Sequence, residues 1–201
     1  MANRLPPYSA PGPQPAPSTT GPNTRVNAQP GFQADGVSAI ALGKNGNRGN
    51  PRELAERVGT RGAASTDADL VTTLLQAEMS LTGGSLETAA VSVLPTLKGA
   101  YCFVMMDERS VYAARDPYGV RPLSIGRLPN GFVVASETCA LDIVGATLVR
   151  DVEPGELIRI DDRGLHAVPF AASPPTAFCT FAFVHLARPA PPSPGSRGPG
   201  S

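Results

Sequence analysis

Apolar positions along the chain change their spacing near residue 99, which divides the sequence into two kinds of structure. Over residues 67–97 the spacing is helical, and a helix beginning at Asp67 would place Leu70, Leu74, Leu75 and Met79 on one face. A further helix is expected over residues 85–97, with a serine at its start that can cap it. After residue 99, short apolar runs separated by turn residues predict strands at hairpin spacing.

The region before these helices contains one short apolar run, at residues 37–42, which predicts a buried strand. It is followed by Gly43 and a polar cluster centred on Asn45 and Gly46. We expect a turn here, because an Asn-Gly pair readily adopts positive φ. A helix with Asn50 as its cap is expected to follow.

The second half of the chain predicts a sheet-rich region. Residues 100–106 are continuously apolar, as in a strand that is covered on both faces. Further strands are expected over residues 110–115, 122–128, 131–136, 147–152 and 156–161. Their connections are too short for parallel crossovers, so antiparallel pairing is expected. Strands packed between helices predict a layered α+β fold.

The amino-acid composition argues against several classes of protein and of binding partner. Seventeen basic and 17 acidic residues cancel, which argues against nucleic acid as a partner. The sequence shows neither a secretory signal nor an apolar run of the roughly 20 residues that span a bilayer, so we expect no membrane and a cytoplasmic location. Three cysteines fit reduced thiols and no metal site. Proline-rich residues 1–17 and 189–201 are expected to be disordered, which leaves residues 18–188 as one domain.

Several short segments occur in one order along this domain. They are STTG at 18–21, NAQP at 27–30, NGN at 45–47, STD at 65–67, RDPYGVRPL at 115–123, SETCALD at 136–142 and VEPGE at 152–156. Together they resemble the glutaminase domain of amidophosphoribosyltransferases, a class with an N-terminal cysteine nucleophile. The resemblance covers residues 18–189 and implies an αββα sandwich of the N-terminal-nucleophile hydrolase type, incomplete at its N-terminus.

The resemblance also implies roles for four residues. Asn45 and Gly46 would stabilise the oxyanion that forms when a nucleophile attacks an amide. Asp67 would receive the α-ammonium of glutamine, and Thr19 would contact the glutamine backbone. From the residues alone, other roles stay open: Asn45-Gly46 as a hairpin turn, Asp67 as a helix N-cap and Thr19 as a polar loop residue. We expect Asn45, Gly46 and Asp67 to face one cleft.

The sequence departs from the family at the positions that carry its chemistry. The family's nucleophile is an N-terminal cysteine, whereas the first cysteine printed here is Cys102, in an apolar strand where a core thiol is expected. The arginine that binds the glutamine carboxylate falls at Ala16, and the histidine before Asn-Gly is Lys44. We therefore expect no glutaminase activity. The family's transferase domain uses Mg, and no cofactor is expected in this chain.

Other charged residues are interpreted as structural. Arg115, Asp116 and Arg121 are expected to form an ion-pair turn between two strands. His166 and His185 lie in late strands, far from any candidate nucleophile, and neither is a good candidate for a general base.

Two functions stay open. The chain would be the glutaminase portion of an enzyme of purine biosynthesis that converts phosphoribosyl pyrophosphate to phosphoribosylamine with glutamine, inactive by itself. Alternatively, it would be a non-catalytic domain that binds glutamine or the subunits of a full-length homologue. The segments at 136–142 and 152–156 argue against the related glucosamine-6-phosphate and asparagine synthetase branches.

Overall fold

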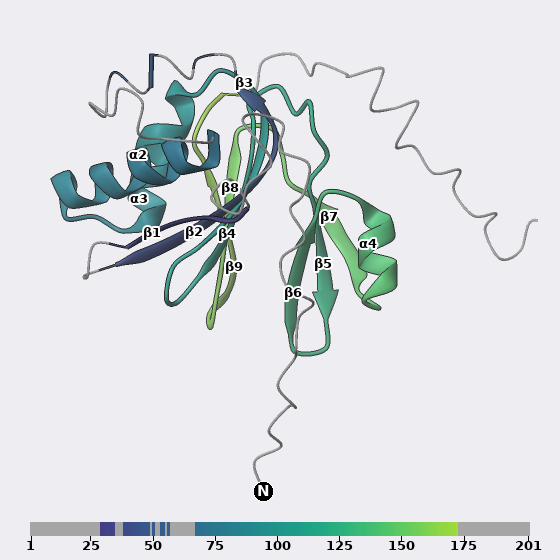
Figure 1. The fold of residues 1–201 in the computed structure, drawn as a ribbon. Helices are drawn as coiled ribbons and strands as arrows, with labels where there is room; N and C mark the ends of the chain where they lie inside the picture. The colour runs from purple at the N-terminus through teal and green to yellow at the C-terminus, as the bar shows by residue number, and fades with distance from the viewer. Residues whose placement is uncertain are drawn as a thin grey trace, which may run out of the picture.

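The apolar runs form two antiparallel sheets in the computed structural model, which describes residues 29–34, 38–48, 50, 53, 54, 56 and 67–172 (Figure 1). The six-stranded sheet has the order β1-β2-β3-β4-β8-β9 and the three-stranded sheet the order β6-β5-β7. The strands are β1 Gly31–Ala34, β2 Ala39–Arg48, β3 Gly99–Met106, β4 Val111–Arg115, β5 Ser124–Leu128, β6 Gly131–Ala135, β7 Thr147–Asp151, β8 Glu156–Asp161 and β9 Gly164–Pro169.

Helices lie on the two outer sides of this pair of sheets. Helix α2 (Asp67–Thr82) and helix α3 (Leu86–Val93), which runs into the 3₁₀ turn η2 (Leu94–Thr96), cover one face of the six-stranded sheet (Figure 1). The three-stranded sheet lies on the other side, and the short helix α4 (Thr138–Ile143) packs beside it. The predicted α+β fold with an αββα arrangement is confirmed.

Strand β3 separates two apolar cores because successive side chains of a strand point to opposite faces. Tyr101, Phe103 and Met105 are buried against the helices, and the Tyr101 hydroxyl donates to the carbonyl of Leu94 at 2.9 Å. Cys102 points to the other face, into the smaller core between the sheets. The prediction of a strand covered on both faces therefore holds for residues 101–103, whereas Val104 and Met106 are exposed.

The three-stranded sheet alternates in the same way. Ile125 of β5 is buried toward the six-stranded sheet. The next residue, Gly126, faces α4, where an added Cβ would lie 3.0 Å from the side chains of Leu141, Val133 and Ala146. Helix α4 can pack this closely on β5 only because position 126 has no side chain.

Helix starts follow the sequence signals. Helix α2 begins at Asp67 as predicted, and Ser85 caps α3 by accepting the N–H of Thr88 at 3.3 Å. Asn50 lies at the predicted start of a helix, because its carbonyl oxygen accepts the N–H of Leu54 at 3.3 Å and residues 53, 54 and 56 are helical. Its side chain also bonds a more distant segment. Its Oδ1 accepts the N–H of Lys98 at 3.0 Å, and its Nδ2 donates to the Thr96 carbonyl at 3.2 Å.

The predicted turn at Asn45-Gly46 is wrong, because β2 continues through both residues to Arg48. Antiparallel pairing with β3 holds this stretch extended, with Asn45 opposite Cys102 and Gly46 opposite Tyr101. The positive φ expected of an Asn-Gly pair occurs only at Gly46, where φ is +132°. Strand β1 was not predicted, because its four residues are too few to show a period.

Several predictions lie outside the described residues. These include the proline-rich segments 1–17 and 189–201, together with Ala16, Thr19 and His185. Within the described part of the chain, no helix is long and apolar enough to cross a membrane.

Candidate functional site

Among the described strands, none lies beside the far end of β2 on one side, and we call this side its open edge. Strand β1 pairs with β2 only over Ala39–Leu42, and no other described strand lies beside the rest of β2 on that side. The N–H of Lys44 points to this side and donates to Gln29 Oε1 at 2.7 Å. Because the backbone groups of a strand alternate in direction, the N–H and C=O of Gly46, two residues further, face the same edge.

A buried ion pair lies on the helix-facing side of this edge. The ammonium of Lys44 is 2.8 Å from Asp67 Oδ2 and 3.4 Å from the carbonyl oxygen of Gly46. Only 5% of the Lys44 side chain and 7% of the Asp67 side chain are exposed. Lys44 follows Ile40 and Leu42 on this face of β2, and Asp67 is the first residue of α2. The arrangement is therefore an ammonium-binding site, and the side chain of Lys44 occupies it.

Asn45 lies on the opposite face of β2 from this ion pair. Its side chain is exposed, and its Nδ2 donates to Ser136 Oγ at 3.3 Å. The expectation that Asn45 and Asp67 face one cleft is wrong, because consecutive residues of a strand point to opposite sides. Gly46 lies between them at the open edge. A ligand in contact with all three residues would have to cross that edge.

Gly46 has a conformation and surroundings that only glycine fits. Its φ of +132° is rarely adopted by residues with a side chain. An added Cβ would also lie 2.2 Å from the carbonyl oxygen of Ala100 on β3. The sequence therefore needs glycine here to keep β2 paired with β3 while the backbone of residue 46 stays accessible at the edge.

Cys102 is the cross-strand neighbour of Asn45, but its thiol is held away from reaction. Burial raises the pKa of this thiol to about 12, although the nearby Arg115 and Arg121 lower it. The sulfur donates to the carbonyl oxygens of Arg121 and Pro122 at 3.5 and 3.6 Å. A group that stays a thiol at neutral pH is a poor nucleophile. The prediction of a core thiol is confirmed.

Two further residues that contact this part of β2 were not predicted as site residues from the sequence. Gln29 bonds the backbone of β2, and Ser136 bonds the side chain of Asn45. Both belong to segments that carried the family resemblance, NAQP and SETCALD, and that order of segments was the available signal. Lys44 was noted only as a departure from the family, and its reach to Asp67 was not predicted.

The turn at residues 115–122 is structural, as predicted, but it is not an ion-pair turn. The guanidinium of Arg115 donates to the carbonyl oxygens of Arg121, Val152 and Gly119 at 2.8, 2.8 and 2.9 Å. The fully buried Asp116 accepts the N–H of Tyr118 at 2.9 Å. No ion pair joins Arg115 to Asp116 in this described turn, because the backbone satisfies both charges.

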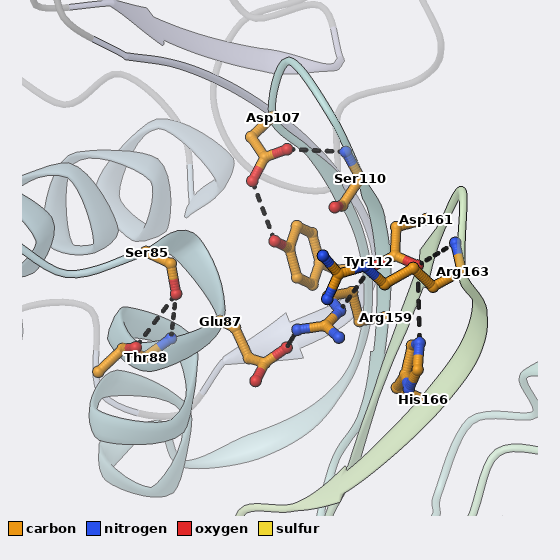
Figure 2. A network of polar contacts seen from close by, with 10 residues as sticks. All are labelled: Ser85, Glu87, Thr88, Asp107, Ser110, Tyr112, Arg159, Asp161, Arg163 and His166. Atoms are coloured by element: carbon orange, nitrogen blue, oxygen red, sulfur yellow. Dashed lines mark hydrogen bonds and ion pairs between the residues drawn. The ribbon is translucent and has the colours of Figure 1, made fainter.

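A second polar cluster joins α3 to strands β8 and β9, at the other end of the six-stranded sheet from β2 (Figure 2). Arg159 of β8 pairs with Glu87 of α3 at 2.7 Å and with Asp161 at 3.1 Å. His166 of β9 lies 3.6 Å from Asp161. Partial burial raises the pKa of Asp161, but the N–H of Arg163 and the charge of Arg159 outweigh it and lower that pKa. Strands β3 and β4 separate this cluster from β2, so it is not part of the candidate site.

Comparison with known proteins connects this geometry to a family. A family model described as a glutamine amidotransferase domain matches residues 22–142. The chain is 51% identical to an amidophosphoribosyltransferase of Mycobacterium leprae over 181 residues, which cover 86% of this chain and 32% of that protein. It is 36% identical to the amidophosphoribosyltransferase of Bacillus subtilis, covering 86% of this chain and 36% of that one.

Solved structures agree with these sequence relatives. The glutamine phosphoribosylpyrophosphate amidotransferase of Bacillus subtilis, complexed with ADP and GMP, superposes with a TM-score of 0.76 at 35% identity. The match covers 84% of this chain and 37% of that chain. A structure described as the allosteric regulatory enzyme of purine biosynthesis gives 0.72 at 36% identity, covering 81% and 35% of the two chains. The chain thus spans about a third of the length of the relatives it matches.

Proposed function

Because this chain belongs to the glutamine amidotransferase domain family, whose model matches more than half of its 201 residues, we propose that it binds glutamine at the open edge of β2. We further propose that it is the glutaminase portion of an amidophosphoribosyltransferase of purine biosynthesis. Its relatives carry that enzyme name, and the structure of one neighbour is described as an enzyme of that pathway.

The observation that carries the proposal is the ammonium-binding arrangement beside Gly46. The carboxylate of Asp67 and the carbonyl of Gly46 already hold one ammonium group. In the proposed complex the carboxamide of glutamine lies near the N–H of Gly46 and the amide of Asn45, which are the donors that an oxyanion would need. A glutamine that crosses the strand edge would reach Asp67 with its α-ammonium group in place of the ammonium of Lys44.

For the chemical step we propose binding without hydrolysis by these 201 residues. The thiol directly opposite Asn45 in the pairing of β2 with β3 is that of Cys102, whose pKa of about 12 keeps it protonated at neutral pH. Donors for an oxyanion do not replace a nucleophile, because they stabilise a charge that forms only after attack. Ammonia release from glutamine above the rate in buffer, sensitive to Asn45→Ala, would contradict this part.

The proposal is tested by titrating glutamine into the full chain in a calorimeter. We expect saturable binding that Asn45→Ala weakens, with Asp162→Asn as a matched control. Asp162 is exposed in the turn between β8 and β9 and should leave the affinity unchanged. Binding that is equally strong in Asn45→Ala would remove the edge of β2 as the site, and no binding in any variant would remove the proposed function.

A further inference from the structure

The ammonium group held at the end of β2 belongs to the chain and not to a ligand. Lys44 Nζ lies 2.8 Å from Asp67 Oδ2 and 3.4 Å from the oxygen of Gly46. Asp67 is also the residue that would receive the α-ammonium of glutamine in the proposed function. One carboxylate therefore has two candidate cations, and one of them is attached to the neighbouring strand.

We propose that Lys44 is a specificity-determining residue that competes with the α-ammonium of the ligand for Asp67. As a result, the site favours primary carboxamides of the length of glutamine that carry no α-ammonium group. This inference rests on the proposed function, because it takes the edge of β2 as the glutamine site.

The competition favours Lys44 for two physical reasons. The lysine is part of the chain, so its contact with Asp67 costs no loss of translational freedom, whereas a free ligand must lose that freedom on binding. The pair is also almost fully buried, where a charge-assisted hydrogen bond is stronger than in water. A ligand that brings an ammonium must first displace that of Lys44.

A ligand without an α-ammonium avoids this displacement. Its carboxamide meets Gly46 and Asn45, which lie at the edge and on the other face of β2, while the Lys44–Asp67 pair stays intact. Glutaramate, which is glutamine without its α-amino group, is the direct probe for this difference.

The first test compares both amides on the unmodified chain and on Lys44→Met by calorimetry. On the unmodified chain, glutaramate should bind at least as tightly as glutamine. In Lys44→Met, glutamine should bind at least about tenfold more tightly than before, the scale of one charge-assisted hydrogen bond, while glutaramate changes less than about threefold. Lys98→Met is the matched control, because Lys98 pairs with Glu53 on the surface and lies outside the site.

The second test needs no amide ligand. Methylammonium is added to Lys44→Met, and the midpoint of thermal unfolding is followed. We expect the midpoint to rise with concentration, because methylammonium fills the place that Lys44 left at Asp67. The unmodified chain and the double variant Lys44→Met/Asp67→Leu should show no such rise.

The outcomes separate this inference from the proposed function. If the unmodified chain binds glutamine more than tenfold more tightly than glutaramate, Asp67 is open to ligands and the inference is overturned. If neither amide binds, the proposed function fails, and the methylammonium test alone decides the role of Asp67. If Lys44→Met does not fold, Lys44→Gln replaces it, since its amide keeps a neutral donor. A folded Lys44 variant that gains nothing from methylammonium also overturns the inference.

Discussion

The end of β2 and the turn at residues 115–122 are both rich in charge, but they satisfy their charges in different ways. In the turn, Arg115 donates to three backbone carbonyls, and Asp116 accepts the backbone N–H groups of Tyr118 and Tyr101. At the end of β2, Lys44 and Asp67 satisfy one another across 2.8 Å.

This difference separates charged residues that only stabilise the fold from charged residues that can also bind a ligand. A charge held by the backbone cannot be exchanged, because its partners are fixed by the fold. A charge held by another side chain can be exchanged for a ligand of the same sign, or both partners can be removed together. Resemblance to the family marked both segments equally, and only their contacts distinguish them.

The largest effect is expected in the turn. Arg115→Met would leave the carbonyls of Arg121, Val152 and Gly119 without their donor. We expect a loss of about 4 kcal/mol in the free energy of unfolding, from hydrogen bonds worth roughly 1.5–3 kcal/mol each that are not fully additive. Urea unfolding measures this, with Arg109→Met, an exposed arginine, as the control. A loss below about 1 kcal/mol would remove the distinction between the regions.

The ion pair should behave differently from the turn in a double-mutant cycle. Lys44→Met and Asp67→Leu should each cost about 3 kcal/mol, because each removes one side of a buried ion pair. The double variant should cost less than either single variant. The same cycle at the exposed Lys98–Glu53 pair, whose side chains are 69% and 58% exposed, should give a coupling under about 1 kcal/mol. Additive losses at Lys44 and Asp67 would show that the pair is not coupled.

A smaller effect is expected from the backbone at the same edge. Gly46→Ala should cost about 2 kcal/mol, because of its φ of +132° and the carbonyl of Ala100 at 2.2 Å from the added Cβ. Gly131→Ala is the control, since an added Cβ there meets nothing within 4 Å. Equal unfolding midpoints for the two variants would mean that the edge of β2 adapts to a side chain.

The smallest effect concerns Asp161, whose charge is held partly by an N–H and partly by other side chains. Its pKa is lowered in the folded state, so its ionised form stabilises the fold above the ordinary pKa of 3.8. That contribution is lost as the pH falls through the lowered pKa. The unfolding midpoint of Asp161→Asn should therefore lie below that of the unmodified chain at pH 7, and the gap should narrow as the pH falls below 3.8.

The sequence predicts best where one signal acts alone. The apolar face of α2 and the cap at Ser85 were predictable, because helical spacing and capping are local. The continuation of β2 through Asn45 and Gly46 was not, because pairing with β3, more than 50 residues away, overrides the local preference for a turn.

The site was predictable in its residues but not in its contacts. The family resemblance selected Asn45, Gly46 and Asp67, and their roles toward glutamine stay predictions. It could not show that Lys44 reaches Asp67, since that contact depends on how α2 packs against β2. Nor could it show that Ser136 meets Asn45 from a strand end of the other sheet.

The alternation of side chains along β3 also restricts where insertions and deletions can occur in this domain during evolution. An insertion or deletion of one residue within β3 would turn Tyr101 away from the carbonyl of Leu94 and move Cys102 toward the helices. Both cores would be disrupted by one event, because a slip of one residue reverses every following side chain. Related chains can therefore change length at hairpins such as that between β5 and β6, whereas β3 can change only by substitution.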